Sequence, residues 1–152
     1  MNTVYLDTET TGISDDDEIV EITIIDDNGE PLLDTLVKPK YHTNWPGAER
    51  VHGISPIDVR NAPAQSQISD DIRKVVKDTR VVIYNAPFDS KFLPELEDAA
   101  EIKCAMRAFA EFNKSKWKSL TNATQIIGYE WEGAHRALAD TKALRAVWKH
   151  MQ

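Results

Sequence analysis

Short apolar runs separated by polar turns occupy the first forty residues of the chain. Runs rich in β-branched residues predict strands over residues 3–7, 18–26 and 32–37. Residues 27–30, between the last two runs, form a turn signal. Three strands joined by short turns predict an antiparallel meander.

After Pro39 the apolar residues fall at helical spacing, interrupted by further strand-like runs. Residues 65–76 repeat apolar side chains along one helical face. The continuous apolar run at 80–84 predicts a buried strand. A helix is predicted over 87–96, followed by a short strand over 102–106 that leads into a helix ending near residue 112. Another helix is predicted over 119–127, with Ser119 as its N-terminal cap and Gly128 as its stop. The last predicted helix covers residues 136–150.

This order of elements predicts an α/β fold, in which helices flank a central mixed five-stranded sheet made of the antiparallel meander and parallel strands. The 152 residues fit one domain over residues 1–152, and 41% of them are hydrophobic, as in ordinary globular proteins. Active sites in such folds collect where strands end and helices begin. Acids at those positions are therefore the first candidates for chemistry.

Charge and cysteine content narrow the functional classes. A net charge of −7 argues against a protein that coats nucleic acid through charge alone, but not against an enzyme that acts on it. The single cysteine excludes an internal disulfide and favours a reducing cytoplasm. We expect no signal peptide, because an acidic motif stands at position 7 where an apolar stretch should be, and no apolar run approaches the ~20 residues that a membrane span needs. We therefore expect a cytoplasmic protein with no membrane partner.

Two carboxylates close the first predicted strand. Asp7 and Glu9 are separated by one residue, so on a strand their side chains project from the same face. Like charges at that spacing repel each other unless a cation lies between them. Oxygen ligands suit Mg²⁺ or Mn²⁺, so the pair predicts a divalent metal site.

Two further acids lie where strands are expected to meet helices. Asp89 stands in the first turn of the helix after the strand at 80–84, although acids favour helix N-termini for dipole reasons alone. Asp140 lies about one turn inside the last helix, and His135 precedes it by five residues, in the loop that leads into this helix. Taken without the other motifs, these two residues are equally well explained as an exposed histidine and a surface aspartate.

Three segments together resemble the motifs of the DnaQ-like 3′–5′ exonucleases of the DEDD superfamily. They are residues 7–12, 85–89 and 135–140, in this order along the chain. The histidine five residues before the last aspartate is similar to the DEDDh branch rather than to the branch with a tyrosine there. Residues 19–22 and 51–55 are similar to the family's second strand and its His-Gly-Ile segment. The compact size and the Ile-Lys-Cys-Ala-Met segment before the middle helix resemble the short exonuclease X type more than the longer RNase T type.

The resemblance implies a ribonuclease H-like fold and a metal-dependent 3′–5′ exonuclease that releases nucleoside 5′-monophosphates from DNA or RNA. Two divalent ions about 4 Å apart would stabilise both oxygens of an in-line displacement. The resemblance assigns His135 as the general base, and an unperturbed pKa of about 6.5 suits that role near neutrality. It assigns four acids to two Mg²⁺ or Mn²⁺ ions, with the first acid bridging them: Asp7, Glu9, Asp89 and Asp140.

The resemblance also implies a set of residues near the terminal nucleotide: Thr8, Thr10, Thr11, Gly12, Ile13, His52, Ile54, Asn85 and Phe88. Gly12 would let the backbone approach closely, and Ile13 would wedge against a base. Phe88 either stacks on a base or packs in the core. Residues 113–118 interleave lysines with Trp117, which predicts either a contact to a phosphate backbone or a solvated loop.

Two alternatives use the same fold. One is a catalytically inactive domain that binds nucleic acid or protein, but such a domain has no need of four acids and a histidine. The other is an endonuclease of the ribonuclease H type, but it has no need of a loop that binds a 3′ end. We expect nucleic acid 3′ ends as partners, single-stranded DNA or RNA first. The sequence is compatible with either sugar, with a polymerase or repair partner, and with a homodimer.

Overall fold

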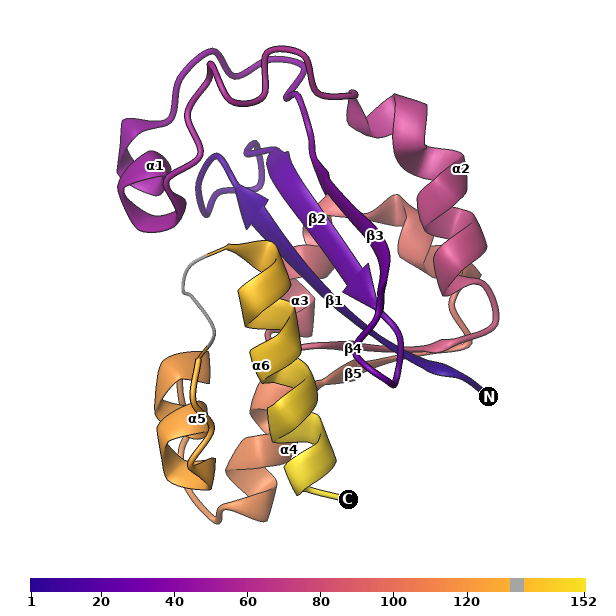
Figure 1. Cartoon of the computed structure of the whole chain (residues 1–152), viewed down its shortest axis with the longest axis vertical. Coiled ribbons are helices and arrows are strands. Elements are labelled where there is room, and N and C mark those ends of the chain that lie inside the picture. Colours follow the sequence, from indigo (N-terminus) through magenta and orange to yellow (C-terminus); the bar gives the residue numbers. More distant parts are fainter. Residues whose placement is uncertain (132–135) are drawn as a thin grey trace.

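The computed structural model describes residues 1–131 and 136–152. Two short 3₁₀ turns, Ser90–Phe92 and Pro94–Asp98, connect α3 (Ala86–Asp89) to β5 (Glu101–Cys104). Within the described residues, no helix combines the length and the hydrophobicity that crossing a membrane requires. The helices and strands, drawn in Figure 1, are β1 (Thr3–Thr10), β2 (Ile19–Ile25), β3 (Pro31–Leu36), α1 (Pro46–His52), α2 (Gln65–Val76), β4 (Arg80–Ile83), α3 (Ala86–Asp89), β5 (Glu101–Cys104), α4 (Ala105–Phe112), α5 (Leu120–Ile127) and α6 (Ala137–His150).

The strands form one mixed sheet in the order β3-β2-β1-β4-β5. β1, β2 and β3 pair antiparallel as a meander, whereas β4 pairs in parallel with both β1 and β5. The predicted α/β architecture is therefore confirmed. β1 is longer than predicted and continues to Thr10, because β2 pairs with it along this extension. Glu9 consequently stands inside a paired strand rather than after it.

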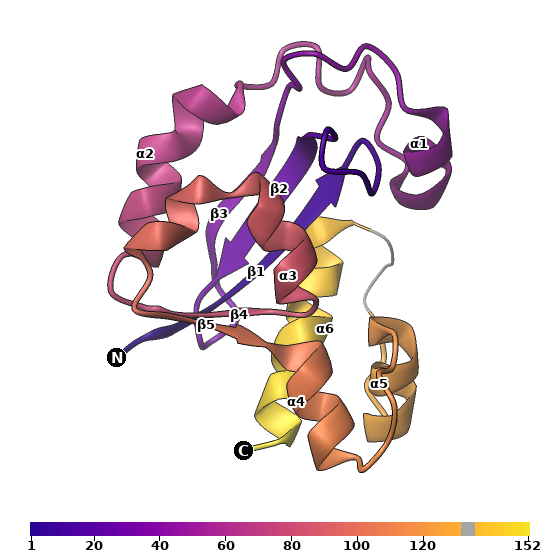
Figure 2. The same ribbon diagram turned by 180° about the vertical axis from the view of Figure 1, so that it is seen from behind.

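Different helices cover the two faces of the sheet (Figures 1 and 2). On one face, Leu6 and Ile83 pack against α2 and the two 3₁₀ turns. On the other face, Tyr5 and residues around it pack against α4, α5 and α6. Successive side chains of a strand point to opposite faces. Asp7 and Glu9 therefore share the face of Tyr5, which α6 covers.

A small separate core supports the chain beside the end of β1. It contains Val20, Trp45, Ile54 and Val59. Trp45 Nε1 donates a hydrogen bond of 2.8 Å to the Ile54 carbonyl. Gly53 ends α1 in the left-handed conformation, with a φ of 75°, which glycine adopts without steric cost. This cluster holds α1 next to the loop that follows β1 (Figure 1).

The single helix predicted over residues 87–96 is wrong. The chain there forms the four-residue α3 and then the two 3₁₀ turns. Pro94 lacks an amide hydrogen and disfavours a helical conformation of the residue before it, and Leu93 has φ −128° and ψ 76°. The α5 signals are confirmed, because Ser119 Oγ accepts a bond of 3.1 Å from the amide at residue 122 and Gly128 ends the helix.

Candidate active site

β1 presents Asp7 and Glu9 side by side on the face covered by α6. In the β1–β2 ladder, Asp7 lies opposite Thr23 and Glu9 lies opposite Glu21. The pairing register shifts directly after Glu9. Such bulges are common beside active sites, where they bend a strand and redirect its side chains. Here the bulge ends the regular ladder at the second acid and starts the loop that follows.

α6 brings Asp140 to the same place from the far end of the chain. The helix begins at Ala137 and packs against β1 and β2, so its first turn lies over the two strand acids. The carboxylate oxygens of Asp7, Glu9 and Asp140 lie within 4.8 Å of one another. Glu9 and Asp140 also share a side-chain hydrogen bond. The fold thus joins the first and third sequence motifs in one cluster.

Asp89 approaches this cluster from the side of β4. It stands in α3, which starts directly after β4, and it is 5% exposed. Thr8 Oγ1 donates a hydrogen bond of 3.0 Å to Asp89 Oδ2. Thr8, a predicted substrate contact, therefore orients this acid in the structure. Asp89 is not among the three acids with oxygens within 4.8 Å, but its charge raises the pKa of Asp7.

Burial raises the pKa values of Asp7, Glu9 and Asp89, and the charges of neighbouring acids add to this effect at Asp7 and Glu9. Burial, followed by the charges of the other three acids, places the pKa of Asp7 well above its ordinary value. Burial, followed by the charge of Asp140, raises the pKa of Glu9 to about 9. Burial raises the pKa of Asp89 to about 7, against the opposing hydrogen bond from Thr8. Without a cation, the cluster therefore retains protons at neutral pH.

The cluster fits a divalent metal centre. Asp7 Oδ2 is buried and has no hydrogen-bond partner in the described part of the chain. A buried carboxylate oxygen without a partner is costly unless it binds a cation. A set of ligands made only of carboxylate oxygens suits hard divalent cations. Asp7, Glu9 and Asp140 are the residues that could hold one, with Asp89 beside them.

A buried carboxylate fixes the start of α6. Glu21 is 4% exposed and accepts hydrogen bonds from Arg136 Nε at 3.1 Å and Nη2 at 2.6 Å. It also accepts a bond of 2.9 Å from the Ala137 amide, one of the free N–H groups at the helix N-terminus. Glu21 thereby holds the first turn of α6, which carries Asp140, against β2. The sequence analysis missed Arg136, whose only signal is its place in the third motif.

His135 lies outside the described residues, and its assignment as general base stays a prediction. The next residue, Arg136, is described and is bonded to Glu21. The ion pair therefore fixes the chain one residue after His135.

The loop that follows β1 is braced by its own side chains. Thr10 Oγ1 donates a hydrogen bond of 2.7 Å to the Gly12 carbonyl, and Thr11 Oγ1 donates one of 2.6 Å to Asp17. A Cβ atom at Gly12 would lie 2.5 Å from Asp17 Oδ2. The close approach predicted for Gly12 is thus made by the Asp17 carboxylate. These bonds give the loop a defined shape beside Glu9.

His52 and Ile54 lie beneath this loop. The Ile54 amide donates a bond of 3.0 Å to His52 Nδ1, so His52 Nε2 carries the hydrogen that it donates to the Thr10 carbonyl at 2.9 Å. Ile54 is 1% exposed, within the small core described above. Both residues support the loop from below, and neither presents a free polar side-chain atom to a nucleotide in this structure.

Three other predicted contacts remain accessible: Ile13 is 85% exposed, Asn85 is exposed, and Phe88 is half-buried. The Phe88 ring packs edge-to-face on a neighbouring phenylalanine, with a centroid distance of 5.3 Å. Lys91, which the sequence analysis missed, joins this side to the loop. Its Nζ lies 5.0 Å from the Phe88 ring centroid and 3.3 Å from the Ile13 carbonyl. Its only sequence signal is its place two residues after Asp89.

Comparison with known proteins gives a family and a set of relatives. A family model described as an exonuclease, RNase T, matches residues 4–147. An uncharacterized exonuclease of Escherichia phage 186 is 35% identical over 91% of this chain and 82% of its own length. The DNA polymerase III subunit epsilon of Rickettsia felis is 35% identical over 68% of this chain, which spans 48% of that protein.

Solved structures share the fold at lower sequence identity. Exonuclease X in complex with 5′ overhanging duplex DNA has a TM-score of 0.80 and 24% identity, over 98% of this chain and 90% of that one. E. coli exonuclease I in complex with a dA16 oligonucleotide has a TM-score of 0.79 and 21% identity, over 99% of this chain and 41% of that one. The ribonuclease H-like fold is thereby confirmed. The chain belongs to the RNase T family of exonucleases, within the DnaQ-like 3′–5′ enzymes that its three motifs predict.

Proposed function

We propose that the chain hydrolyses the last phosphodiester bond of a single-stranded 3′ end and releases one nucleoside 5′-monophosphate per step. The observation that carries this proposal is that one carboxylate oxygen from each of Asp7, Glu9 and Asp140 lies within 4.8 Å of the others, with a buried Asp7 oxygen that no described residue hydrogen-bonds. That arrangement suits two divalent cations, Mg²⁺ or Mn²⁺. Catalysis then requires residues that hold the cations, accept a proton and fix the strand end.

The proposed catalytic residues divide these tasks. Asp7 would hold both cations, and Glu9, Asp89 and Asp140 would complete their ligands. When bound, the cations would supply an activated water and stabilise the oxygen of the leaving group. The Thr8 hydroxyl fixes the Asp89 carboxylate by its hydrogen bond. His135 would accept the proton of the attacking water in its neutral form, since its ordinary pKa is about 6.5.

The accessible side chains suit the terminal nucleotide. We assign base contacts to Ile13 and Phe88, both of which contact Lys91, and a polar contact to Asn85. Lys91 also lies 3.1 Å from Asp15 and would offer a positive charge to a phosphate. The braced loop would place its backbone against the sugar. The residues proposed to maintain the shape of this pocket are Thr10, Thr11, Gly12, His52 and Ile54.

DNA is the favoured substrate in this proposal. The relatives include subunits named for DNA polymerase III, and the structural neighbours include exonucleases in complex with DNA. The chain spans less than half of the Rickettsia felis subunit, and the proposed function does not include association with a polymerase. A cytoplasmic location likewise stays a prediction from the single cysteine.

The direct test is cleavage of 5′-labelled oligonucleotides of DNA and RNA, single-stranded and duplex, with Mg²⁺ or Mn²⁺. We expect a ladder that shortens from the 3′ end, fastest on single-stranded DNA, and no cleavage in EDTA. The released product should comigrate with a nucleoside 5′-monophosphate.

Two outcomes of the same gel would contradict the proposal. Internal fragments from the earliest time points would indicate an endonuclease of the ribonuclease H type. Binding without any cleavage, with each metal over a broad pH range, would indicate an inactive binding domain. A 3′-phosphorylated oligonucleotide serves as the control for end recognition, because an enzyme that needs a free 3′ end should process it more slowly.

Removing divalent metal should lower protein stability most at alkaline pH. The pKa values of Glu9 and Asp89 are raised to about 9 and about 7, so the folded state retains protons that the unfolded state has released. The free energy of unfolding of the metal-free protein therefore falls as pH rises from about 4 to about 9. A cation that replaces these protons on the carboxylates restores the free energy of unfolding. We expect millimolar Mn²⁺ to raise Tm over EDTA by about 5–10 °C at pH ~8.5 and far less at pH ~5.5.

Thermal unfolding followed by circular dichroism measures this difference. Asp7→Asn, which lacks the acid proposed to hold both cations, should show a much smaller gain from Mn²⁺ at pH ~8.5. An equal metal-induced gain at both pH values would mean that the cation does not displace protons from these carboxylates.

A further inference from the structure

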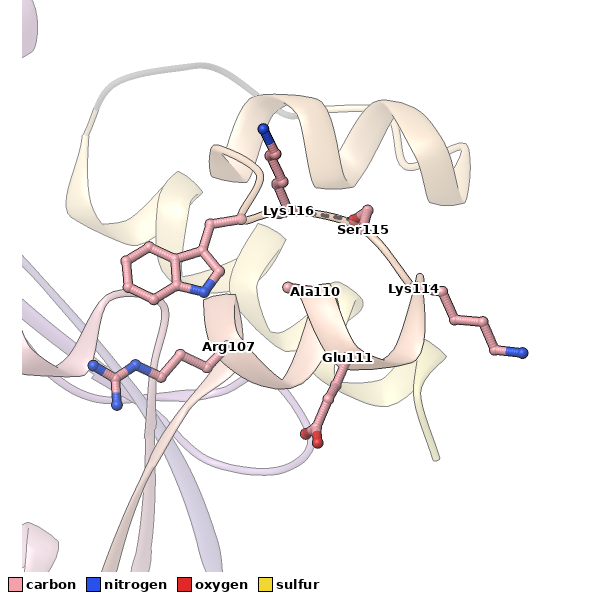
Figure 3. A pocket seen from close by; sticks show the side chains of 7 residues that line it. Arg107, Ala110, Glu111, Lys114, Ser115 and Lys116 are labelled. Carbon is pink, nitrogen blue, oxygen red and sulfur yellow. Dashed lines mark hydrogen bonds between the residues drawn. The ribbon is translucent and has the colours of Figure 1, made fainter.

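A basic, aromatic cleft lies outside the acidic cluster, at the end of α4. Its volume is about 800 Å³, and its lining includes Arg107, Ala110, Lys114, Lys116 and Trp117. In Figure 3, Arg107 and Lys114 point away from opposite ends of the cleft, with Ala110 between them and Lys116 above. Nothing in the catalytic proposal uses these residues.

The charge of this segment is opposite to that of the chain. Residues 107–118 contain four cations and one acid, Glu111, whereas the whole chain has a net charge of −7. Arg107, Lys114 and Lys116 are exposed, and none of them forms an ion pair with another described residue. Cations left without acidic partners on an acidic protein are suited to an anionic ligand.

Trp117 supplies a flat apolar surface inside this basic segment. Its side chain is 61% exposed, although tryptophan is usually well buried. The guanidinium carbon of Arg107 lies 5.5 Å from the Trp117 ring centroid. An exposed aromatic ring beside cations is the combination that binds single-stranded nucleic acid, because bases stack on the ring while cations neutralise phosphates.

Hydrogen bonds hold the loop in this shape. The Ser115 amide donates to the Ala110 carbonyl at 3.0 Å, and the Asn113 side-chain amide donates to Ser115 Oγ at 3.1 Å. Lys114 has a φ of 50°, in the left-handed region that favours glycine. A lysine at that position costs conformational energy that glycine would avoid. Lysine differs from glycine at this position by its positive charge, which is available to a ligand.

A hydrogen bond from Tyr84 ties this loop to the end of β4, the strand that leads into α3 and Asp89. The Tyr84 hydroxyl donates a bond of 2.5 Å to the Lys118 carbonyl. Tyr84 follows β4 directly and precedes Asp89 by five residues. Trp117, next to Lys118, is therefore anchored beside the strand end that delivers Asp89 to the acidic cluster.

We propose that this cleft binds the single strand upstream of the 3′ end, with a base stacked on Trp117 and phosphates beside Arg107, Lys114 and Lys116. The inference rests on the proposed function for its direction, because the 3′ nucleotide must lie at the acidic cluster. It adds a second contact, on the same strand, to the pocket for the terminal nucleotide. Affinity should then increase with substrate length and decrease with salt.

Binding is measured in an Asp7→Asn background, so that no result depends on cleavage. The probes are fluorescein-labelled oligothymidylates of about 4 and about 16 nucleotides, within the range of known single-strand site sizes. We expect Lys114→Gln with Lys116→Gln to weaken binding of the longer probe about ten-fold at moderate salt and to reduce the salt slope by about one unit. Trp117→Leu should weaken it at least about five-fold. The ratio of the affinities for the two probes should fall in each variant.

Two controls separate binding from folding. Lys74→Gln with Lys77→Gln removes the same charge from exposed positions of α2 and the residue after it, and should leave the ratio of affinities unchanged. Lys114→Gly should raise Tm, because glycine suits the left-handed conformation, while still weakening the longer probe. If Lys114 had only a structural role, a variant with a higher Tm would not bind the longer probe more weakly.

The proposal is overturned if the lysine pair of the cleft behaves like the α2 pair, or if Trp117→Leu leaves affinity for the longer probe unchanged. Polyglutamate, added at the same charge concentration as the longer probe, serves as a competitor. If it displaces that probe from the wild-type chain, the proposal is also overturned, since the cleft would then recognise acidic polymers in general. If the wild-type chain failed to cleave any 3′ end, the proposed function would fail, while these binding measurements would still decide the role of the cleft.

Discussion

Asp7→Asn abolishes 3′ hydrolysis and leaves a folded protein that is at least as stable as wild type in EDTA at neutral pH. Asparagine keeps the size of the side chain but removes the charge that a cation requires, so we expect kcat to fall by at least about 10³-fold. In the metal-free protein the same change removes the free-energy cost of burying an acid beside three other acids, the same cost that raises the pKa of Asp7. Single-turnover cleavage and thermal unfolding of the same preparation measure both effects.

Asp16→Asn is the matched control for this change. Asp16 is an exposed acid in the loop that follows β1, and its substitution removes the same charge close to the site without touching the cluster. We expect cleavage within about two-fold of wild type, as for most surface substitutions. Substantial residual activity in Asp7→Asn, with Mn²⁺ as well as Mg²⁺, would remove this residue from the metal centre.

His135→Ala slows cleavage by about 10²–10⁴-fold near neutral pH, with partial recovery at higher pH. A neutral imidazole accepts the proton of the attacking water, so the wild-type rate should rise with pH through about 6.5 and then level off. The variant lacks this base and should keep rising with hydroxide concentration. A profile of kcat against pH with saturating oligonucleotide distinguishes the two shapes.

His150→Ala is the control for the second prediction. His150 stands at the opposite end of α6 and packs edge-to-face on Phe112. Its loss should leave the shape of the pH profile unchanged. An unaltered profile in His135→Ala as well would show that another group, or water itself, accepts the proton.

The strands and the antiparallel meander follow closely from the sequence, because each strand depends on local signals, whereas the order β3-β2-β1-β4-β5 was not predicted. β-branched runs and short turns define the meander, and the apolar run at residues 80–84 defines β4. The break after Asp89 was not foreseen, because the apolar spacing of residues 87–96 continues through Pro94. The proline decides the conformation there, against the periodic pattern.

The acids of the site could be predicted from their sequence motifs, but the residues that surround and orient these acids could not. Spacing on a strand predicts that Asp7 and Glu9 lie side by side. It does not indicate that Thr8, on the opposite face, orients Asp89, since that bond depends on where α3 starts. Nor does the spacing indicate the hydrogen bond between Glu21 and Arg136, two residues that are 115 positions apart in the sequence. Such pairs are properties of the packed fold.

The predicted substrate residues show the same limit. His52 and Ile54 match a family segment, yet in the structure they brace a loop from beneath. Which face of a short segment is buried depends on the elements packed against it, here α1 and the small core around Trp45. Lys91 shows the converse, because it reaches the loop after β1 from a turn that follows Asp89.

Anomalous diffraction from crystals grown with Mn²⁺ and a nucleoside 5′-monophosphate tests the metal centre most directly. Two peaks about 4 Å apart, between the carboxylates of β1 and those of α3 and α6, are the expected result. Both should disappear in Asp7→Asn. Absence of anomalous density at saturating Mn²⁺, or density bound elsewhere while these carboxylates remain without a cation, would contradict the account.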